Sequence, residues 1–342
     1  MSNKYFRLQP FSRQLCPAPR NSKKDREGVI FPAGGRLVAL LLLTLFANIP
    51  GRCQTLRDDA GHVFAPGAPP ERIVSLAPNI TEILFALGLG DKIVGVTRYC
   101  DYPPAALEKE KVGGFLDPDF EKIKSLTPDL VIGFRGNPLG ALEKLRSIGL
   151  SVFVLDIGNV LEDVPRTIDK IGRIARRTEE ARALVRSLSE KYRTATISLA
   201  GVTTKPRVFL SIHGLGLSTC GRESYFNDLL ERAKSINVTG RIPKPWFEYT
   251  KESLIKDNPD VIIILAKSGR DFEASRDWFK AQPGFEAIKA VRQGRFGFLD
   301  EDPASRFGPR LYDTFAELVR LIHPEGENSG LFDGQRSIED RF

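Results

Sequence analysis

Residues that carry catalysis or bind transition metals are scarce in this chain. Its 342 residues include three histidines and four cysteines. The histidines, His62, His213 and His323, are scattered, and no two cysteines have the spacing of a zinc site, so we expect no metal centre. The sequence also lacks the Gly-x-Ser-x-Gly turn of hydrolases and the Gly-Lys-Ser/Thr phosphate loop. These absences predict a binding protein that uses no cofactor, and not an enzyme.

Net positive charge is absent from the body of the chain. The formal charge of +7 comes from residues 1–53, which hold nine of the 50 basic and two of the 43 acidic residues. Residues 54–342 therefore carry 41 of each sign. A nucleic-acid-binding domain concentrates basic residues on its folded surface. We therefore expect no nucleic-acid partner.

An apolar run at residues 37–47 is too short to cross a membrane. It has 11 residues, whereas a spanning helix needs about 20. It follows a basic stretch that ends at Arg36 and precedes a Pro-Gly break, which is the arrangement of a secretory signal peptide. We expect residues 1–53 to be this signal region, with cleavage close to Cys53 and release of an exported protein. The alternative is a lipid anchor on Cys53, although Ile49-Pro-Gly-Arg52 is a poor match to the small residues that directly precede a lipidated cysteine.

Beyond residue 72, short apolar runs alternate with helical patterns. Strands are expected at residues 73–76, 93–96, 130–134, 151–155, 208–211, 261–265 and 295–299. Strands separated by helices predict an α/β fold with mostly parallel sheets. A helical period that starts at Thr178 continues for about twenty residues without a strand, so we expect one long rigid helix between two lobes. At the first helix, Asn79 and Glu82 have the spacing of a capping box.

These patterns divide the chain into five segments. They are a signal region (1–53), an N-terminal α/β lobe (54–158), a connecting helical segment (159–203), a C-terminal α/β lobe (204–325) and a polar tail (326–342). After removal of the signal region one cysteine remains in each lobe, Cys100 and Cys220. We expect free, partly buried thiols; the alternative is a disulfide that ties the lobes together.

One phrase occurs twice, 131 residues apart. Glu121 is followed after six residues by Pro128-Asp129 and an apolar run, and Glu252 is followed at the same spacing by Pro259-Asp260 and another apolar run. Both copies predict a short helix, a Pro-Asp break and a buried strand. The repeat favours two similarly built lobes that each carry a glutamate at a matching place.

Aromatic side chains fall where strands end. Tyr99, Phe115, Phe134 and Trp246 lie at predicted strand ends or in the loops that follow. Ligands of open α/β sheets bind beyond the carboxyl ends of the strands, and rings offer a flat apolar contact there. Packing inside each lobe is the alternative, and for Phe134 the two are evenly balanced, whereas Trp246 is expected to be exposed in a proline-rich loop.

The combination of motifs resembles a known family. Residues 72–132 ("RIVSLAPNITEILFALGLGDKIVGVTRYCDYPP…VGGFLDPDFEKIKSLTPDLVI") are similar to the substrate-binding proteins of ABC importers for vitamin B12, haem and ferric siderophores. The resemblance continues through "RVFLSIHGLGLSTCGRES", "PWFEYTKESLIKDNPDVIII" and "RFGPRL", over roughly residues 70–324. Within the family the likeness is closest to the vitamin B12 binders. It implies two α/β lobes joined by a long rigid helix.

The resemblance also implies which residues face the ligand. Aromatic positions of the family fall on Tyr99, Phe115, Phe134 and Trp246, another falls on Ile212, and a polar pair falls on Asp302 and Arg306. Family tryptophans are phenylalanines at 115 and 134, and a family aromatic is isoleucine at 212. We therefore expect the space between the lobes to hold a large, partly apolar ring.

The same resemblance implies a partner and a location. Glu121 and Glu252 match acidic residues that meet arginines on the membrane permease, where charge-assisted pairing orients the encounter. We expect a periplasmic monomer that delivers cobalamin to an ABC importer. One alternative keeps the class with a ferric siderophore or haem as ligand, which a basic cluster in the cleft would favour; the sequence shows only scattered candidates such as Arg98, Arg135 and Arg306. The other is an exported α/β hydrolase, for which no nucleophile–base pair is visible.

Overall fold

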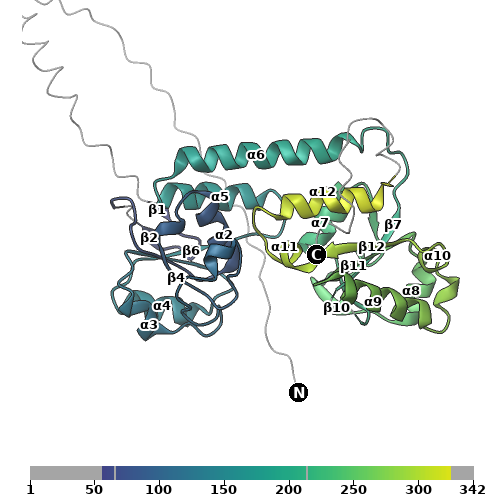
Figure 1. The fold of residues 1–342 in the computed structure, drawn as a ribbon, viewed down its shortest axis with the longest axis horizontal. Coiled ribbons are helices and arrows are strands. Elements are labelled where there is room, and N and C mark those ends of the chain that lie inside the picture. Colours follow the sequence, from purple (N-terminus) through teal and green to yellow (C-terminus); the bar gives the residue numbers. More distant parts are fainter. Residues whose placement is uncertain (1–55, 65–66, 213–214, 325–342) are drawn as a thin grey trace, which may run out of the picture. The chain divides into compact units, whose positions relative to one another are not determined.

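Two parallel four-stranded sheets form the centres of two lobes (Figure 1). The computed structural model describes residues 56–64, 67–212 and 215–324. The strand order is β4-β3-β5-β6 in the N-terminal lobe and β12-β11-β7-β9 in the C-terminal lobe. Read from the opposite edge, the second order pairs β9 with β4, β7 with β3, β11 with β5 and β12 with β6. The two lobes therefore repeat one topology.

The N-terminal lobe alternates strands and helices as the sequence predicts. Its elements are β1 Leu56–Arg57, β2 Val63–Phe64, β3 Ile73–Ser75, α2 Pro78–Ala86, β4 Ile93–Val96, α3 Phe120–Ser125, β5 Leu130–Phe134, α4 Leu139–Ser147 and β6 Val152–Leu155. The sheet strands are buried on both faces, which explains why they appear in the sequence as uninterrupted apolar runs.

The C-terminal lobe follows the same pattern and adds a short antiparallel pair. Its elements are β7 Arg207–Ser211, β8 Ser218–Cys220, α7 Tyr225–Arg232, β9 Ile236–Asn237, β10 Trp246–Glu248, α8 Lys251–Asp257, β11 Val261–Ala266, α9 Gly269–Ala281, α10 Lys289–Arg292, β12 Phe296–Asp300, α11 Glu301–Ser305 and α12 Leu311–Ile322. Strand β10 pairs antiparallel with β8.

Two helices connect the lobes. Helix α5 (Asp163–Ile174) turns sharply into the 20-residue helix α6 (Thr178–Ile197). The turn needs Gly172, because a Cβ there would lie 2.4 Å from the Cβ of Ala181. Helix α6 packs on α5 at one end and on α12 of the C-terminal lobe at the other (Figure 1). Tyr192 of α6 stacks on Phe315 of α12 at 5.1 Å. The predicted fold class, two α/β lobes joined by a long helix, is confirmed.

The repeated phrase is a structural module that fastens each sheet. In the N-terminal lobe the Asp129 carboxylate accepts hydrogen bonds from the backbone N–H groups of Glu71 and Arg72, at 2.7 and 3.1 Å. The Arg72 guanidinium returns to the carbonyl of Leu126, at 2.7 and 3.0 Å. The Pro-Asp step thus ties the start of β5 to the start of β3.

The C-terminal copy makes the same bonds except one, since the residue before Arg207 is Pro206, which has no N–H to donate. Asp260 accepts from the N–H of Arg207 at 2.8 Å, and the Arg207 guanidinium donates to the carbonyl of Asp257 at 2.8 and 3.2 Å. The residue before each proline, Thr127 or Asn258, has the same positive φ of 44°. The predicted likeness of the two lobes therefore extends to individual hydrogen bonds.

Some local expectations are wrong. Asn79 and Glu82 do not form a capping box, because α2 begins two residues earlier than that box requires. The N-cap residue is Ala77, whose side chain makes no capping hydrogen bond. Both side chains instead contact the C-terminal lobe. Trp246 lies in strand β10 and not in a loop, although it is exposed as expected.

Both cysteines of the described ranges are buried and free. The Cys100 sulfur lies 3.1 Å from the hydroxyl oxygens of Thr81 and Thr97, and burial raises the pKa of the Cys220 thiol to about 12. An interlobe disulfide is therefore not formed. Residues 1–55 and 325–342, and with them the predicted signal region, Cys53 and the polar tail, lie outside the described residues. The lobe boundaries themselves stay a prediction.

We predict that Asp129→Ala and Asp260→Ala each lower the free energy of unfolding by about 1.5–3 kcal/mol, because each variant leaves a backbone N–H, that of Arg72 or Arg207, without its charged acceptor. Urea unfolding followed by circular dichroism measures this. Glu121→Ala and Glu252→Ala are matched controls, since these exposed acids lie in the same two copies and form no ion pair within the described residues, and they should change stability by less than about 0.5 kcal/mol. Equal effects of the aspartate and glutamate variants would contradict the prediction.

Candidate functional site

Three aromatic rings gather at the carboxyl edge of the N-terminal sheet. Tyr99 follows β4, Phe115 lies in the loop before α3, and Phe134 ends β5. The ring centres of Tyr99 and Phe115 are 5.3 Å apart, and those of Phe115 and Phe134 are 6.4 Å apart. Tyr99 is 45% exposed and the two phenylalanines are half-buried. The parallel strands thus bring together three rings that are far apart in sequence, as predicted.

The C-terminal lobe carries the other expected apolar residues. Trp246 is 46% exposed and its ring leans edge-on against Tyr225 at 5.8 Å and Phe226 at 6.0 Å. The hydroxyl of Tyr225 donates to the carbonyl of Ala304 at 2.7 Å, which fixes the ring beneath the indole. Ile212 directly follows β7 and is almost fully buried. Of the two expected ligand residues, Trp246 and Ile212, Trp246 therefore offers the larger exposed apolar surface.

Asp302 and Arg306 belong to an ionic network that joins the lobes. The Arg306 guanidinium donates to Asp302 of its own lobe at 2.7 Å, and to Asp101 at 2.8 Å and the carbonyl of Tyr99 at 2.6 Å in the other lobe. This arrangement attaches the loop that carries Tyr99 to the C-terminal lobe. A direct contact of Asp302 and Arg306 with a ligand stays a prediction.

Arg310 extends the same network into a buried place. It forms two parallel hydrogen bonds with Glu82, at 2.6 and 3.0 Å, and one with Asp302 at 2.7 Å. Its guanidinium lies 3.8 Å from the ring centre of Tyr102. The side chain of Glu82 is only 4% exposed. Planar two-point pairing of this kind fits arginine and carboxylate geometry.

Burial acts to raise the pKa values of Glu82 and Asp302, whereas the hydrogen bonds from arginine act to lower them. Burial raises the pKa of Glu82 above its ordinary value of 4.5, although the hydrogen bonds from Arg310 oppose the change. Burial also opposes ionisation of Asp302, but the hydrogen bonds from Arg310 and Arg306 outweigh it and the pKa of Asp302 is lowered. Glu82 is thus the acid whose charge depends most on its arginine.

The other two arginines that could have formed a basic cluster are neutralised. Arg98 pairs with Asp117 at 2.6 Å, and Arg135 pairs with Asp156 at 3.0 Å. Arg98 also lies over the ring of Tyr99, 5.7 Å from its centre. With Arg306 held by Asp101 and Asp302, none of the three candidates is a free cation. These three arginines are therefore parts of ion pairs.

Glu121 and Glu252 occupy the same position in α3 and α8. Each is the second residue of its helix, after an N-cap residue (Asp119 or Thr250) whose side chain accepts a backbone N–H. Both carboxylates are exposed, and neither forms an ion pair within the described part of the chain. A negative charge at a helix start is favoured by the helix dipole. Each lobe thus presents one available carboxylate at an equivalent point.

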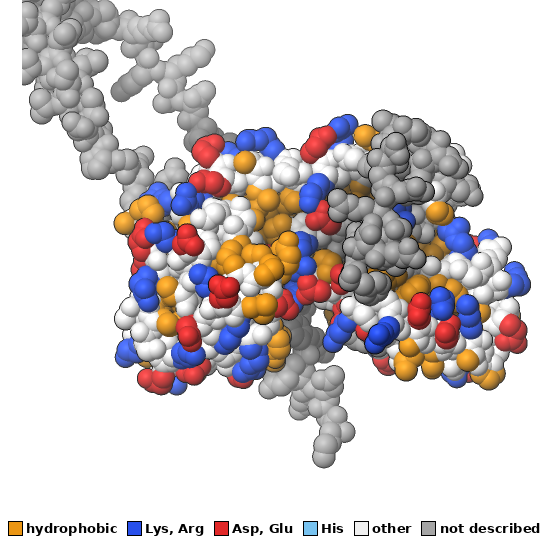
Figure 2. Space-filling model, in the orientation of Figure 1, with side chains coloured by type: hydrophobic (Ala, Val, Ile, Leu, Met, Phe, Trp, Pro, Cys, Tyr) orange, Lys and Arg blue, Asp and Glu red, His pale blue; other side chains and the backbone are white. Residues whose placement is uncertain are grey.

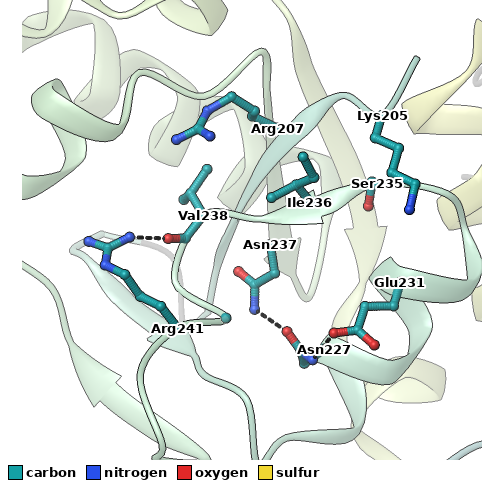
Figure 3. A pocket seen from close by; sticks show the side chains of 10 residues that line it. Lys205, Arg207, Asn227, Glu231, Ser235, Ile236, Asn237, Val238 and Arg241 are labelled. Atoms are coloured by element: carbon teal, nitrogen blue, oxygen red, sulfur yellow. Dashed lines mark hydrogen bonds between the residues drawn. The ribbon is translucent and has the colours of Figure 1, made fainter.

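Two cavities lie in the C-terminal lobe, and the expected ligand residues line neither. One of about 560 Å³ opens beside the edge strand β9. There Asn237 donates to Asn227 at 3.0 Å, Asn227 donates to Glu231 at 2.8 Å, and Arg241 donates to the carbonyl of Val238 (Figure 3). Its polar groups bind one another, so it belongs to the scaffold. The other, about 350 Å³, lies at the end of β11 and the start of α9.

The structure adds three exposed apolar residues that the sequence analysis did not select. They are Tyr102, Leu116 and Leu139, with exposed fractions of 44%, 63% and 61%. Tyr102 and Leu116 lie in the loops of Tyr99 and Phe115, and Leu139 begins α4 after the loop of Phe134. Figure 2 shows hydrophobic side chains gathered on the N-terminal lobe. In the sequence, only their position within a few residues of Tyr99, Phe115 and Phe134 could have identified them.

Two similar lobes joined by a long helix, with exposed rings on each, define a two-lobed binding protein. Within the described residues no group of acids, histidines and cysteines could hold a metal ion, and no helix is long and apolar enough to cross a membrane. Residues 73–303 match the family model of the periplasmic binding proteins, and the chain belongs to that family.

Its relatives are substrate-binding proteins with differing ligands. An ABC transporter substrate-binding lipoprotein of Bacillus subtilis is 30% identical over 75% of this chain and 81% of its own length. A vitamin B12-binding protein of Photorhabdus laumondii is 29% identical over 76% and 90%. The structure of a periplasmic heme-binding protein from Roseiflexus superposes with a TM-score of 0.65 at 26% identity, over 75% of this chain and 99% of that one. The likeness is to transport proteins and not to enzymes.

We predict that Arg310→Leu destabilises the protein by about 3–5 kcal/mol at pH 7, because it leaves the buried carboxylate of Glu82 unpaired. The cost should shrink as the pH falls towards 5. The pKa of Glu82 is already raised and rises further without Arg310, so the folded state binds a proton before the unfolded state does and gains stability on acidification.

Urea unfolding of the variant and the native protein at pH 7, 6 and 5 measures this difference. Glu82→Gln is the matched control, because it removes the titrating carboxylate, so its cost should not shrink as the pH falls. An Arg310→Leu cost that stays constant from pH 7 to pH 5 would contradict the argument.

Proposed function

We propose that this protein captures a corrinoid (cobalamin) between its two lobes in the periplasm and delivers it to an ABC importer. The observation that carries the proposal is the set of aromatic rings at the strand ends of both lobes, beside which Arg98, Arg135 and Arg306 are already paired with acids. A corrinoid is a large ring with neutral amide side chains, so it needs flat apolar contacts and few charges.

Each expected residue has a role in this proposal. Tyr99, Phe115 and Phe134 contact one face of the ring from the N-terminal lobe, and Trp246, with Ile212 beneath, contacts it from the C-terminal lobe. Asp302 and Arg306 accept from and donate to the amide fringe at the edge of the site, in addition to joining the lobes. The similarity to vitamin B12-binding proteins supports the choice of ligand.

Haem is the second candidate, and the likeness to a heme-binding structure favours it. Haem carries two propionates and a ferric siderophore complex is commonly anionic, so either ligand gains from free cations near the rings. Burying a carboxylate without a partner is costly. The ion pairs of Arg98, Arg135 and Arg306 therefore favour the neutral ring over both anionic alternatives.

The ligand is tested by titrating residues 54–342 with cyanocobalamin, haemin and a ferric siderophore by calorimetry. We expect cyanocobalamin to bind with a Kd below about 1 μM, or about −8 kcal/mol, and more tightly than the other two. Phe115→Ala and Trp246→Ala should each weaken it by about 10- to 100-fold, since buried aromatic anchors commonly contribute 1–3 kcal/mol. Tighter binding of haemin or the siderophore would replace the proposed ligand.

Docking is the second part of the proposal, and it assigns Glu121 and Glu252 to the permease. The double variant Glu121→Arg/Glu252→Arg should abolish ligand uptake by cells that depend on this protein, because the charges would then repel permease arginines. Ligand affinity should be unchanged. Glu108→Arg/Glu273→Arg is the matched control, with the same charge change at two exposed acids, and should still support uptake. Lost ligand affinity in the first variant would place these acids in the ligand site instead.

A further inference from the structure

The side chain of Asn137 joins three segments behind the aromatic rings. It lies in the turn after β5 and is 3% exposed. Its Nδ2 donates to the carbonyl of Phe115 at 2.8 Å and to the carbonyl of Leu76 at 3.3 Å, while its Oδ1 accepts from the N–H of Phe134 at 2.8 Å. Both amide hydrogens and the oxygen are thus in use.

These bonds connect the backbones of two ring-bearing residues through one rigid amide. Phe115 and Phe134 are 19 positions apart in sequence and their ring centres are 6.4 Å apart. Leu76 directly follows the central strand β3, so the third bond ties both loops to the sheet. Through Asn137, the backbones of both ring-bearing residues are therefore bonded to the end of the central strand β3.

The local sequence suits this arrangement. A Cβ at Gly136 would lie 2.1 Å from the Phe134 ring, so the turn that carries Asn137 admits the ring only because residue 136 is glycine. Backbone bonds hold the two ends of the Phe115 loop: the N–H of Arg98 donates to the carbonyl of Gly113 at 2.9 Å, and the N–H of Gly114 donates to the carbonyl of Asp117 at 3.2 Å. Asp117 also pairs with Arg98 at the exposed surface, and surface pairs of this kind contribute little. At Phe115 itself, the attachment is the bond from the buried side chain of Asn137.

We propose that Asn137 is a positioning residue that sets the spacing of Phe115 and Phe134 and so prepares the N-terminal lobe for a ring-shaped ligand. This rests on the proposed function for the nature of the ligand, but the positioning itself can be measured without one. A site held in its binding geometry before the ligand arrives avoids the entropy cost of ordering side chains on binding.

Asn137→Asp is the informative substitution, because it keeps the shape and reverses the hydrogen-bonding pattern. The carboxylate has no N–H to donate and would face the carbonyl oxygens of Phe115 and Leu76, so it repels both. The bond from the N–H of Phe134 can persist. The loop of Phe115 should then leave the sheet while the strand of Phe134 stays in place.

The first measurement uses a tryptophan at position 115 as a reporter. Phe115→Trp and Phe115→Trp/Asn137→Asp are compared by acrylamide quenching without ligand, after subtraction of the signal of Trp246 and Trp278 in the matching protein with Phe115. We expect the reporter's quenching constant to rise at least about twofold with Asn137→Asp, because the loop loses its buried attachment.

Asp58→Asn is the matched control. Asp58 is buried in the same lobe and accepts bonds from the N–H groups of Ala60 and His62 and from Arg146, none of them in the loops of Phe115 or Phe134. It should lower stability without changing the reporter. An unchanged reporter in folded Asn137→Asp, or an equal change in Asp58→Asn, would overturn the proposal.

The second measurement is affinity. With Phe115 restored, Asn137→Asp should weaken cyanocobalamin binding by about 10- to 100-fold, the effect of losing a preorganised contact worth 1–3 kcal/mol, while Asp58→Asn leaves it within about twofold. If the native protein does not bind cobalamin, the proposed function fails and the reporter still decides the role of Asn137. If Asn137→Asp does not fold, Asn137→Ala replaces it in both measurements, since it removes the two donated bonds, together with the bond from the N–H of Phe134, without adding a charge.

Discussion

The ion pair of Arg310 and Glu82 joins one lobe to the other, and both side chains are largely buried. A buried ion pair is stabilising only when its geometry and hydrogen bonds compensate the loss of hydration, and here Arg310 satisfies two acids and lies on Tyr102. Loss of Arg310 would leave the carboxylate of Glu82 without a partner in a buried environment that disfavours its charge. Together with α6, which packs on helices of both lobes, this pair joins the lobe that carries Tyr99, Phe115 and Phe134 to the lobe that carries Trp246.

The same network determines how much positive charge Arg306 and Arg310 can offer to a ligand. Arg306 and Arg310 are taken up by Asp101, Glu82 and Asp302, so the arginines that hold the lobes together cannot also neutralise an anion without giving up those bonds. A neutral ligand makes no such demand. The structural role of the arginines and the preference for a corrinoid in the proposed function are therefore two consequences of one arrangement.

Much of this fold was predictable because its signals are local. Buried parallel strands appear as apolar runs, α6 as a twenty-residue period, and the repeated Pro-Asp phrase as a likeness between the lobes. The aromatic edge followed from the rule that parallel strands end together. The roles of Asn79 and Glu82 were not predictable: their spacing fits a capping box, and only tertiary structure brings Phe307 and Arg310 to them. Asn137 carried no signal, since its three partners lie 3, 22 and 61 residues away.

The two lobes share one hydrogen-bonded module but differ in what they add to it. In both, an aspartate and an arginine tie the helix–strand phrase to the first strand of the sheet, so α3 and α8 start at equivalent places and present Glu121 and Glu252 alike. Beyond the strand ends the likeness stops: one lobe adds three rings and the amide of Asn137, the other a single exposed indole on an antiparallel strand. In the proposed function, the shared module would serve docking on the permease and the divergent loops would contact a ligand whose two faces differ.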